Sequence, residues 1–88
     1  MVNVRNMTSK SGNKVANQFL ISQDDGQYFQ SYGSIIVKRA TNGEITLDET
    51  YWDYSVTTGK YRNQFLHETK KDTERKIKDG TYKLANLN

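Results

Sequence analysis

Two dipeptides, Asp25-Gly26 and Asn42-Gly43, constrain the fold of this chain more than any other feature of its sequence. Both are typical of two-residue hairpin turns, because the central positions of such turns need positive φ angles that Asn, Asp and Gly adopt readily. Each dipeptide separates two runs rich in β-branched and aromatic residues, which favour strands. The sequence therefore predicts an antiparallel meander of about four strands, with a bulge or bend at Gly33. The expected strands cover residues 15–23, 27–32, 34–40 and 44–47.

Helix signals replace strand signals in the second half of the chain. Ser55, Thr57 and Thr58 offer N-cap oxygens for a helix whose apolar face carries an aromatic pair and a leucine further along. A second helix is expected to begin at a capping box formed by Thr69 and Asp72, and to end at Gly80. Residues 81–84 can return as a last strand. We therefore expect an α+β fold: a small antiparallel β-meander of about four strands, two short helices and a final strand.

A chain of 88 residues allows one domain, residues 1–88, with a thin core. Six Tyr, three Phe and one Trp provide large buried areas in a chain that is short of aliphatic residues. The block from Trp52 to Leu66 is expected to determine how the helix closes the sheet. The core is predicted to contain Phe19, Ile36, Trp52, Tyr61, Phe65 and Leu66.

The composition argues against most kinds of active site. The chain has no Cys and a single His, which excludes disulfides, thiolate metal sites and sites with several histidines. The hydroxyl residues that precede His67 are better explained as helix caps than as a nucleophile with its base. The paired acidic residues Asp24-Asp25 and Asp48-Glu49 show no metal-binding or phosphate-binding pattern. We therefore expect no enzyme, no metal and no cofactor. The longest apolar run, residues 35–37, is also far too short to span a membrane.

Charge is distributed unevenly along the chain. Residues 1–59 contain five basic and six acidic residues, a net charge of −1, whereas residues 60–88 contain eight basic and four acidic residues, a net charge of +4. Lys71, Arg75 and Lys78 fall on one stripe of the second predicted helix, where they could follow a phosphate backbone. The alternative is an ordinary solvated helix face, stabilised by the pairs Glu74–Lys78 and Asp72–Lys76 at a spacing of four residues.

Aromatic residues gather in two clusters, at residues 28–32 and 51–54. Such residues stack on nucleobases, anchor protein interfaces or simply fill a core. Tyr54 is the one expected to point outward, and Tyr61 is a second possible stacking platform. The candidate residues for binding a partner protein or a nucleic acid are Tyr54, Lys60, Arg62, Lys71, Arg75 and Lys78.

The segment that reads Trp52-x-Tyr54-Ser55-x-Thr57-Thr58-x-Lys60 resembles a group of short bacteriophage and prophage proteins that have no established activity. The similarity extends to the segment from Tyr28 to Ile35 and to the Lys-rich helix that ends in Gly, so it covers nearly the whole chain. The resemblance implies a phage source and action in the cytoplasm of the bacterial host.

Three functions are compatible with these observations. The leading one is a non-enzymatic phage accessory protein that binds a host macromolecule, expected to be a protein, and acts as an inhibitor of a host defence nuclease in the manner of anti-CRISPR proteins. The alternative is a nucleic-acid-binding domain that uses the basic C-terminal helical surface. A further alternative is a minor virion component. None of them requires a membrane.

Overall fold

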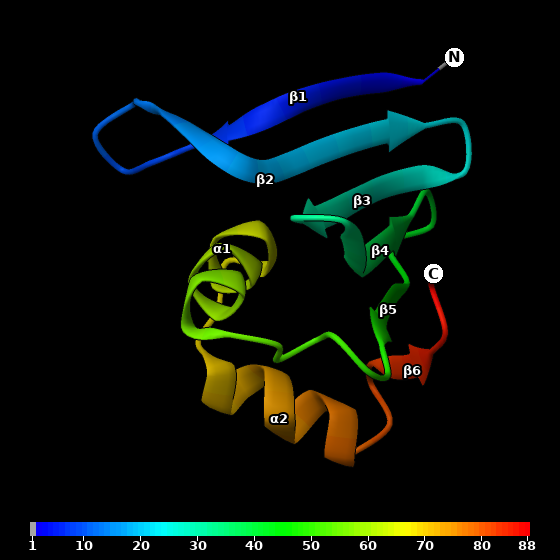
Figure 1. The fold of residues 1–88 in the computed structure, drawn as a ribbon. Coiled ribbons are helices and arrows are strands. Elements are labelled where there is room, and N and C mark those ends of the chain that lie inside the picture. The colour runs from blue at the N-terminus through cyan, green and yellow to red at the C-terminus, as the bar shows by residue number, and fades with distance from the viewer. Residues whose placement is uncertain (1) are drawn as a thin grey trace.

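The chain folds into one six-stranded sheet and two helices, and the computed structural model describes residues 2–88. Figure 1 shows the sheet curving around the two helices, which lie on its concave side. Among residues 2–88, neither helix is long and apolar enough to cross a membrane. The elements are β1 (Asn3–Thr8), β2 (Lys14–Gln23), β3 (Gly26–Ser31), β4 (Ser34–Ala40), β5 (Ile45–Asp48), α1 (Val56–Leu66), α2 (Lys70–Lys78) and β6 (Lys83–Ala85).

The strands lie in the sheet in their sequence order, from β1 to β6. Strands β1 to β5 form an antiparallel meander, and β6 pairs with β5 in parallel, because the connection through both helices returns the chain to the same end of the sheet. The expected α+β class is confirmed, as are the four central strands, the two helices and the last strand. The sheet has more strands than the predicted meander, because β1 adds an edge strand that the sequence analysis did not identify.

The hairpins exist where they were predicted, but three turns differ in detail. Arg39 pairs with Ile45 and the Ala40 N–H donates to the Glu44 carbonyl oxygen, so residues 41–43 form a three-residue turn in which Gly43, and not Asn42, has a positive φ.

Gln23 pairs with Gly26, so the turn between β2 and β3 is Asp24-Asp25 and not Asp25-Gly26. Gly26 has a φ of +144°, and a Cβ at this position would collide with the carbonyl oxygen of Arg39 on β4. This glycine is therefore needed for close strand packing as well as for its backbone conformation.

Gly33 does not form a bulge. Ser31 pairs with Ser34, so Tyr32 and Gly33 form the turn between two separate strands, and Tyr32 takes the positive φ of 55°. The bulge lies further along β4: Phe29 pairs with Val37 and the next residue of β3 pairs with Ile35, which leaves one extra residue on β4 between these pairs.

Both helix starts follow the predicted capping chemistry. The Ser55 side chain accepts a hydrogen bond from the Thr58 backbone N–H at the start of α1. At the start of α2 the Thr69 hydroxyl accepts from the Asp72 N–H, and the Asp72 carboxylate accepts from the Thr69 N–H, which completes the capping box. The α2 helix ends at Lys78, and Asp79 is its C-cap residue, directly before Gly80.

The core lies between the concave face of the sheet and the helices. It contains four of the six predicted residues, and Trp52 is half-buried and packs against it. The buried hydrophobic residues are Met7, Phe29, Ile36, Val37, Ile45, Leu47, Tyr61, Phe65, Leu66 and Tyr82.

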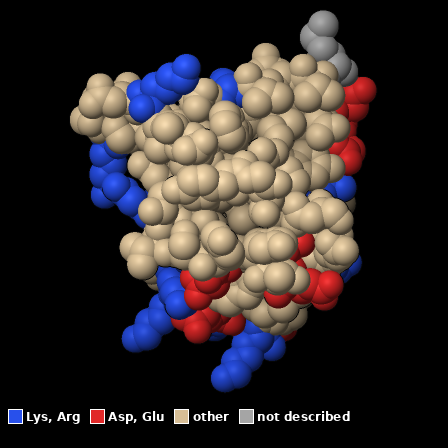
Figure 2. Space-filling model, viewed as in Figure 1, with Lys and Arg blue, Asp and Glu red and all other residues tan. Residues whose placement is uncertain are grey.

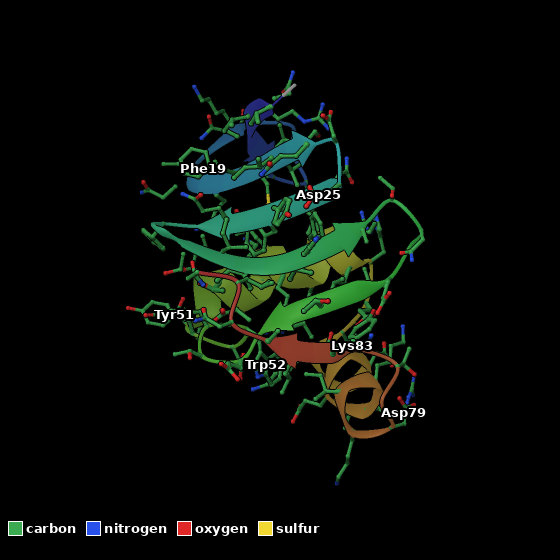
Figure 3. The ribbon with its side chains drawn as sticks, turned by 90° about the vertical axis from the view of Figure 1, so that its right-hand side faces the viewer. Phe19, Asp25, Tyr51, Trp52, Asp79 and Lys83 are labelled. Atoms are coloured by element: carbon green, nitrogen blue, oxygen red, sulfur yellow. The ribbon has the colours of Figure 1, made fainter. Side chains whose placement is uncertain are left out.

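Phe19 is not part of this core, which corrects the prediction. Side chains alternate between the two faces of a strand, and Leu20, opposite Phe29, packs against the core. Phe19 therefore points to the other face and is only half-buried, whereas its neighbour Gln18 is fully buried. Figure 3 looks onto this other face, with α1 behind the strands.

Candidate functional site

Exposed apolar side chains surround the start of α1. Ser31 of β3 and the N-cap Ser55 both hydrogen-bond to the Thr58 hydroxyl, at 2.8 and 3.1 Å. The residues next to these serines face solvent: Tyr32 is 50% exposed, Tyr54 64% and Val56 92%. The outward orientation predicted for Tyr54 is confirmed. A rigid chain of hydroxyl hydrogen bonds thus carries three exposed apolar residues, which we call the α1 apical group.

Arg62 lies on α1, on the buried side of the helix, and is only 1% exposed. Its Nη1 donates to the Trp52 carbonyl oxygen at 2.9 Å and to Asp53 Oδ1 at 3.1 Å, and its Nη2 donates to Asn63 Oδ1 at 2.9 Å. Its guanidinium carbon is 5.3 Å from the centre of the Trp52 ring. The prediction that Arg62 binds a partner at the surface is therefore wrong, because this cation joins the loop before α1 to the helix itself.

Asp53 connects this buried arginine to the second helix. Its other oxygen, Oδ2, lies 2.7 Å from the Lys70 ammonium at the first turn of α2. Burial alone would raise the pKa of Asp53, but the hydrogen bonds from Lys70 and Arg62 outweigh it and hold the pKa below its ordinary value. The hydrogen bond to Asp53 also raises the pKa of Lys70. Asp53 therefore stays ionised and sets the spacing between the two helices.

A groove of about 930 Å³ lies between the β1–β2 turn, α1 and the connection between the helices. Lys10, Lys60 and Lys70 line it, and Arg62 and Asp53 lie beside Gly59. The groove is further lined by Thr8, Ser9, Ser55, Val56, Asn63, Gln64, His67 and Glu68. We call it the lysine groove. It is cationic, because four basic residues line it, Lys10, Lys60, Arg62 and Lys70, against two acidic ones, Asp53 and Glu68.

The predicted basic stripe of α2 lines a different depression. Lys71, Arg75 and Lys78 are exposed and line a shallow groove of about 600 Å³ together with Trp52, Glu74 and Ile77. We call this the Trp52 groove. Figure 3 places Trp52 between the lower edge of the sheet and α2. Figure 2 shows that the face seen in Figure 1 is uncharged at its centre, with basic side chains around its margins and acidic ones at the lower and right-hand margins.

The solvated-helix interpretation proposed an ion pair between Lys76 and Asp72, but Lys76 pairs with a different residue. Its ammonium lies 2.7 Å from Glu68 Oε1, which also accepts from the Tyr82 hydroxyl at 2.7 Å. The Thr73 hydroxyl donates to the other carboxylate oxygen at 2.6 Å. This network fastens α2 to the end of α1 and to the segment before β6.

His67 directly follows the last residue of α1. It is the C-cap residue, with a left-handed φ of 56°, and it faces solvent at the lysine groove. The hydroxyls of Ser55 and Thr58 bond to each other and to the helix start, as the capping interpretation predicted. No group of three or more His, Cys, Asp or Glu residues that could hold a metal occurs among residues 2–88.

The six predicted binding residues thus separate into four locations. Lys60 lines the lysine groove and Tyr54 belongs to the α1 apical group, whereas the three basic residues of α2 line the Trp52 groove and Arg62 is buried. The sequence analysis missed Lys10, Val56 and Gly59. Val56 had a signal, because it is an apolar residue among helix-capping hydroxyls and lies outside the apolar face of the helix. Lys10 had none, since its place beside α1 depends on the whole sheet.

A sequence model of the family of unknown function DUF8033 matches residues 2–80. The chain belongs to this family. All the residues of both grooves and of the α1 apical group lie within the part that matches DUF8033, whereas β6 lies beyond it. No curated protein and no solved structure matches the chain.

Proposed function

We propose that this chain is a binding protein without a catalytic role, and that it engages a host protein through the α1 apical group and the adjoining lysine groove. One observation carries the proposal: Tyr54 and Val56 are 64% and 92% exposed at the rim of a large cationic groove. Tyrosines in such positions are frequent anchors of protein interfaces, because they bury a large area with few rotatable bonds.

The charge of the groove favours an acidic partner surface. Lys10 and Lys60 make no ion pair within residues 2–88, so both ammonium groups are available to a partner carboxylate. Lysines at the rim of an interface mainly accelerate association and select the partner by its charge, while the apolar anchors supply most of the affinity.

The supporting structure is rigid, which reduces the entropic cost of binding. The hydroxyl chain through Thr58 holds the start of α1, and the Arg62–Asp53–Lys70 contacts hold the loop before it. Side chains that are already positioned lose less conformational freedom when a partner binds.

The resemblance to phage and prophage proteins supports a setting for this interaction. In this proposal the chain is a phage accessory protein that acts in the cytoplasm of the bacterial host and inhibits its target, with a defence nuclease as the leading candidate. Inhibition of this kind needs only a complementary patch of about 800 Å² per partner, which a domain of this size can supply.

The proposal is tested by capture of the tagged protein's target from nuclease-treated bacterial lysate, followed by an affinity measurement on the purified pair. The variant Tyr54→Ala/Val56→Ser is expected to weaken binding by about 30-fold or more, equivalent to about 2 kcal/mol. Val4→Ala is the matched control, because Val4 is 58% exposed but lies on the edge strand β1. Equal affinity of the wild type and the double variant would refute the proposed surface.

A second candidate function, nucleic-acid binding, is favoured by a separate observation. Lys71, Arg75 and Lys78 all lie exposed along one side of the Trp52 groove. In this alternative the α2 row neutralises phosphates. Replacement of all three by Gln would abolish the binding of a nucleic acid, while leaving capture of a protein through the α1 apical group unchanged.

A further inference from the structure

We propose that the Trp52 groove is a site for single-stranded nucleic acid, in which one base stacks on the Trp52 ring and the basic row of α2 holds the adjacent phosphates. This inference rests on the second candidate function and adds to it the form of the nucleic acid and the residue that recognises it.

The position of Trp52 suits a stacking platform. Arg62 lies against the ring at 5.3 Å and is itself buried, and its Nη1 also holds the Trp52 carbonyl oxygen. Trp52 is half-buried and lines the Trp52 groove, whereas Arg62 does not. The proposed site therefore has an indole that Arg62 holds in place and that reaches the groove, where a base can stack on it.

The basic row runs along the groove at a spacing that suits a strand. Lys71, Arg75 and Lys78 are four and three residues apart on α2, so they share one side of the helix and span about 10 Å along its axis. The contact of Arg75 with Asp72, at 3.5 Å, joins two exposed side chains and is easily exchanged for a phosphate. Against these three cations the groove carries a single carboxylate, that of Glu74.

The geometry favours a single strand over a duplex and over an acidic protein segment. In a duplex the bases are paired and stacked on each other, so none can lie on Trp52 unless it is first extruded. An acidic peptide would satisfy the α2 row, but carboxylate side chains have no flat ring to stack on the indole. Contact with Trp52 therefore distinguishes the three ligands.

The fluorescence of Trp52 provides the test, because this is the only tryptophan in the chain. Oligothymidylate of about 12 nucleotides is expected to quench the emission, with a log–log salt dependence of about −2 for three phosphate contacts to a single strand. Lys71→Gln/Arg75→Gln/Lys78→Gln should remove the binding. Lys10→Gln/Lys60→Gln, a change of two lysines in the other groove, is the matched control and should leave it unchanged.

A second variant tests the stacking directly. Trp52→Leu should weaken the binding of fluorescein-labelled oligothymidylate by about tenfold or more. Because Trp52 also packs against the core, Trp52→Tyr is measured beside it and should recover most of the affinity. Circular dichroism and a thermal transition establish that each variant is folded.

Each outcome decides the question. Quenching by the oligonucleotide and not by a blunt duplex of the same length supports the inference. Binding of both without quenching refutes the stacked single strand but keeps nucleic-acid binding by the α2 row. If neither the oligonucleotide nor the duplex binds, the stacked single strand and nucleic-acid binding by the α2 row are both refuted. Equal quenching by polyglutamate shows a general site for acidic polymers and overturns the inference.

Discussion

Two glycine-to-alanine substitutions are expected to change the stability of this protein in opposite directions. Gly59 lies in the interior of α1, where a Cβ would lie 3.6 and 3.7 Å from the two terminal nitrogens of Arg62 and 3.8 Å from Asp53 Oδ1. These are ordinary van der Waals distances, so the methyl group fits without displacing its neighbours.

Gly59→Ala should therefore raise the free energy of unfolding by about 1 kcal/mol, the difference between Gly and Ala inside a helix. In a domain of this size, that corresponds to a rise of about 4–8 °C in the midpoint of thermal unfolding. Gly26→Ala should instead lower the free energy of unfolding by about 3 kcal/mol or more, because it combines an unfavourable φ with a collision against the Arg39 carbonyl.

Urea denaturation followed by circular dichroism measures both effects on the same scale. The wild type and the two variants should have similar m-values, so that the change lies in the midpoint. A fall in stability of Gly59→Ala would show that α1 lies closer to Asp53 than this structure places it. A neutral Gly26→Ala would refute the tight approach of β3 and β4.

Three further predictions concern the core, the carboxylates and the caps. Phe65→Ala should cost about 3–5 kcal/mol, because Phe65 is buried against Phe29 at 6.1 Å, and a loss below about 1 kcal/mol in urea denaturation would contradict this packing. Burial alone would raise the pKa of Asp48. The carboxylate accepts hydrogen bonds from the N–H groups of Leu87 and Tyr51, from the Asn88 amide and from the Thr50 N–H, and together these outweigh burial and hold the pKa below its ordinary value of 3.8. The stability that Asp48 contributes should therefore be complete above this pH and lost as the pH falls below it, and this loss should be smaller in Asp48→Asn when denaturation is compared at about pH 6 and about pH 3. Thr69→Ala should cost about 1 kcal/mol through loss of the capping box, and equal urea midpoints for variant and wild type would exclude this role.

Local features of the fold could be predicted from the sequence because each depends on residues close together in the chain. The Asn42-Gly43 turn, the Ser55 cap and the capping box at Thr69 are of this kind. Their hydrogen bonds join residues that are at most four positions apart. In each case both hydrogen-bond partners therefore lie within one short segment of the sequence, where a local pattern can identify them.

Strand β1 and the position of Phe19 show where this reasoning ends. Only Met7 is buried in β1, and an edge strand with polar residues on both faces has no alternating pattern to detect. In β2 the alternation is present, but it does not tell which face the helices will cover. Leu20 and Gln18 are on the face of β2 that α1 packs against, so they face the core and Phe19 does not.

Arg62 illustrates the same limit in the candidate site. By sequence it is one basic residue among eight in the C-terminal third. It is buried because the Trp52 carbonyl and the Asp53 carboxylate, about ten residues earlier, both face it once the loop folds under α1. Pairing at this separation depends on the tertiary structure, and charge counting therefore overestimated the basic surface.

The parallel pairing of β6 has a consequence for the order of folding. Strands β1 to β5 are joined by short turns and can form early, whereas the β5–β6 pair joins Thr46 to Lys83 across both helices. Closing such a long loop costs chain entropy before any contact compensates for it, so β6 should add to the sheet after the rate-limiting step. A destabilising change in β6 would then speed unfolding and leave the folding rate almost unchanged. The lifetime of the native state, rather than the speed at which it forms, is what this last strand controls.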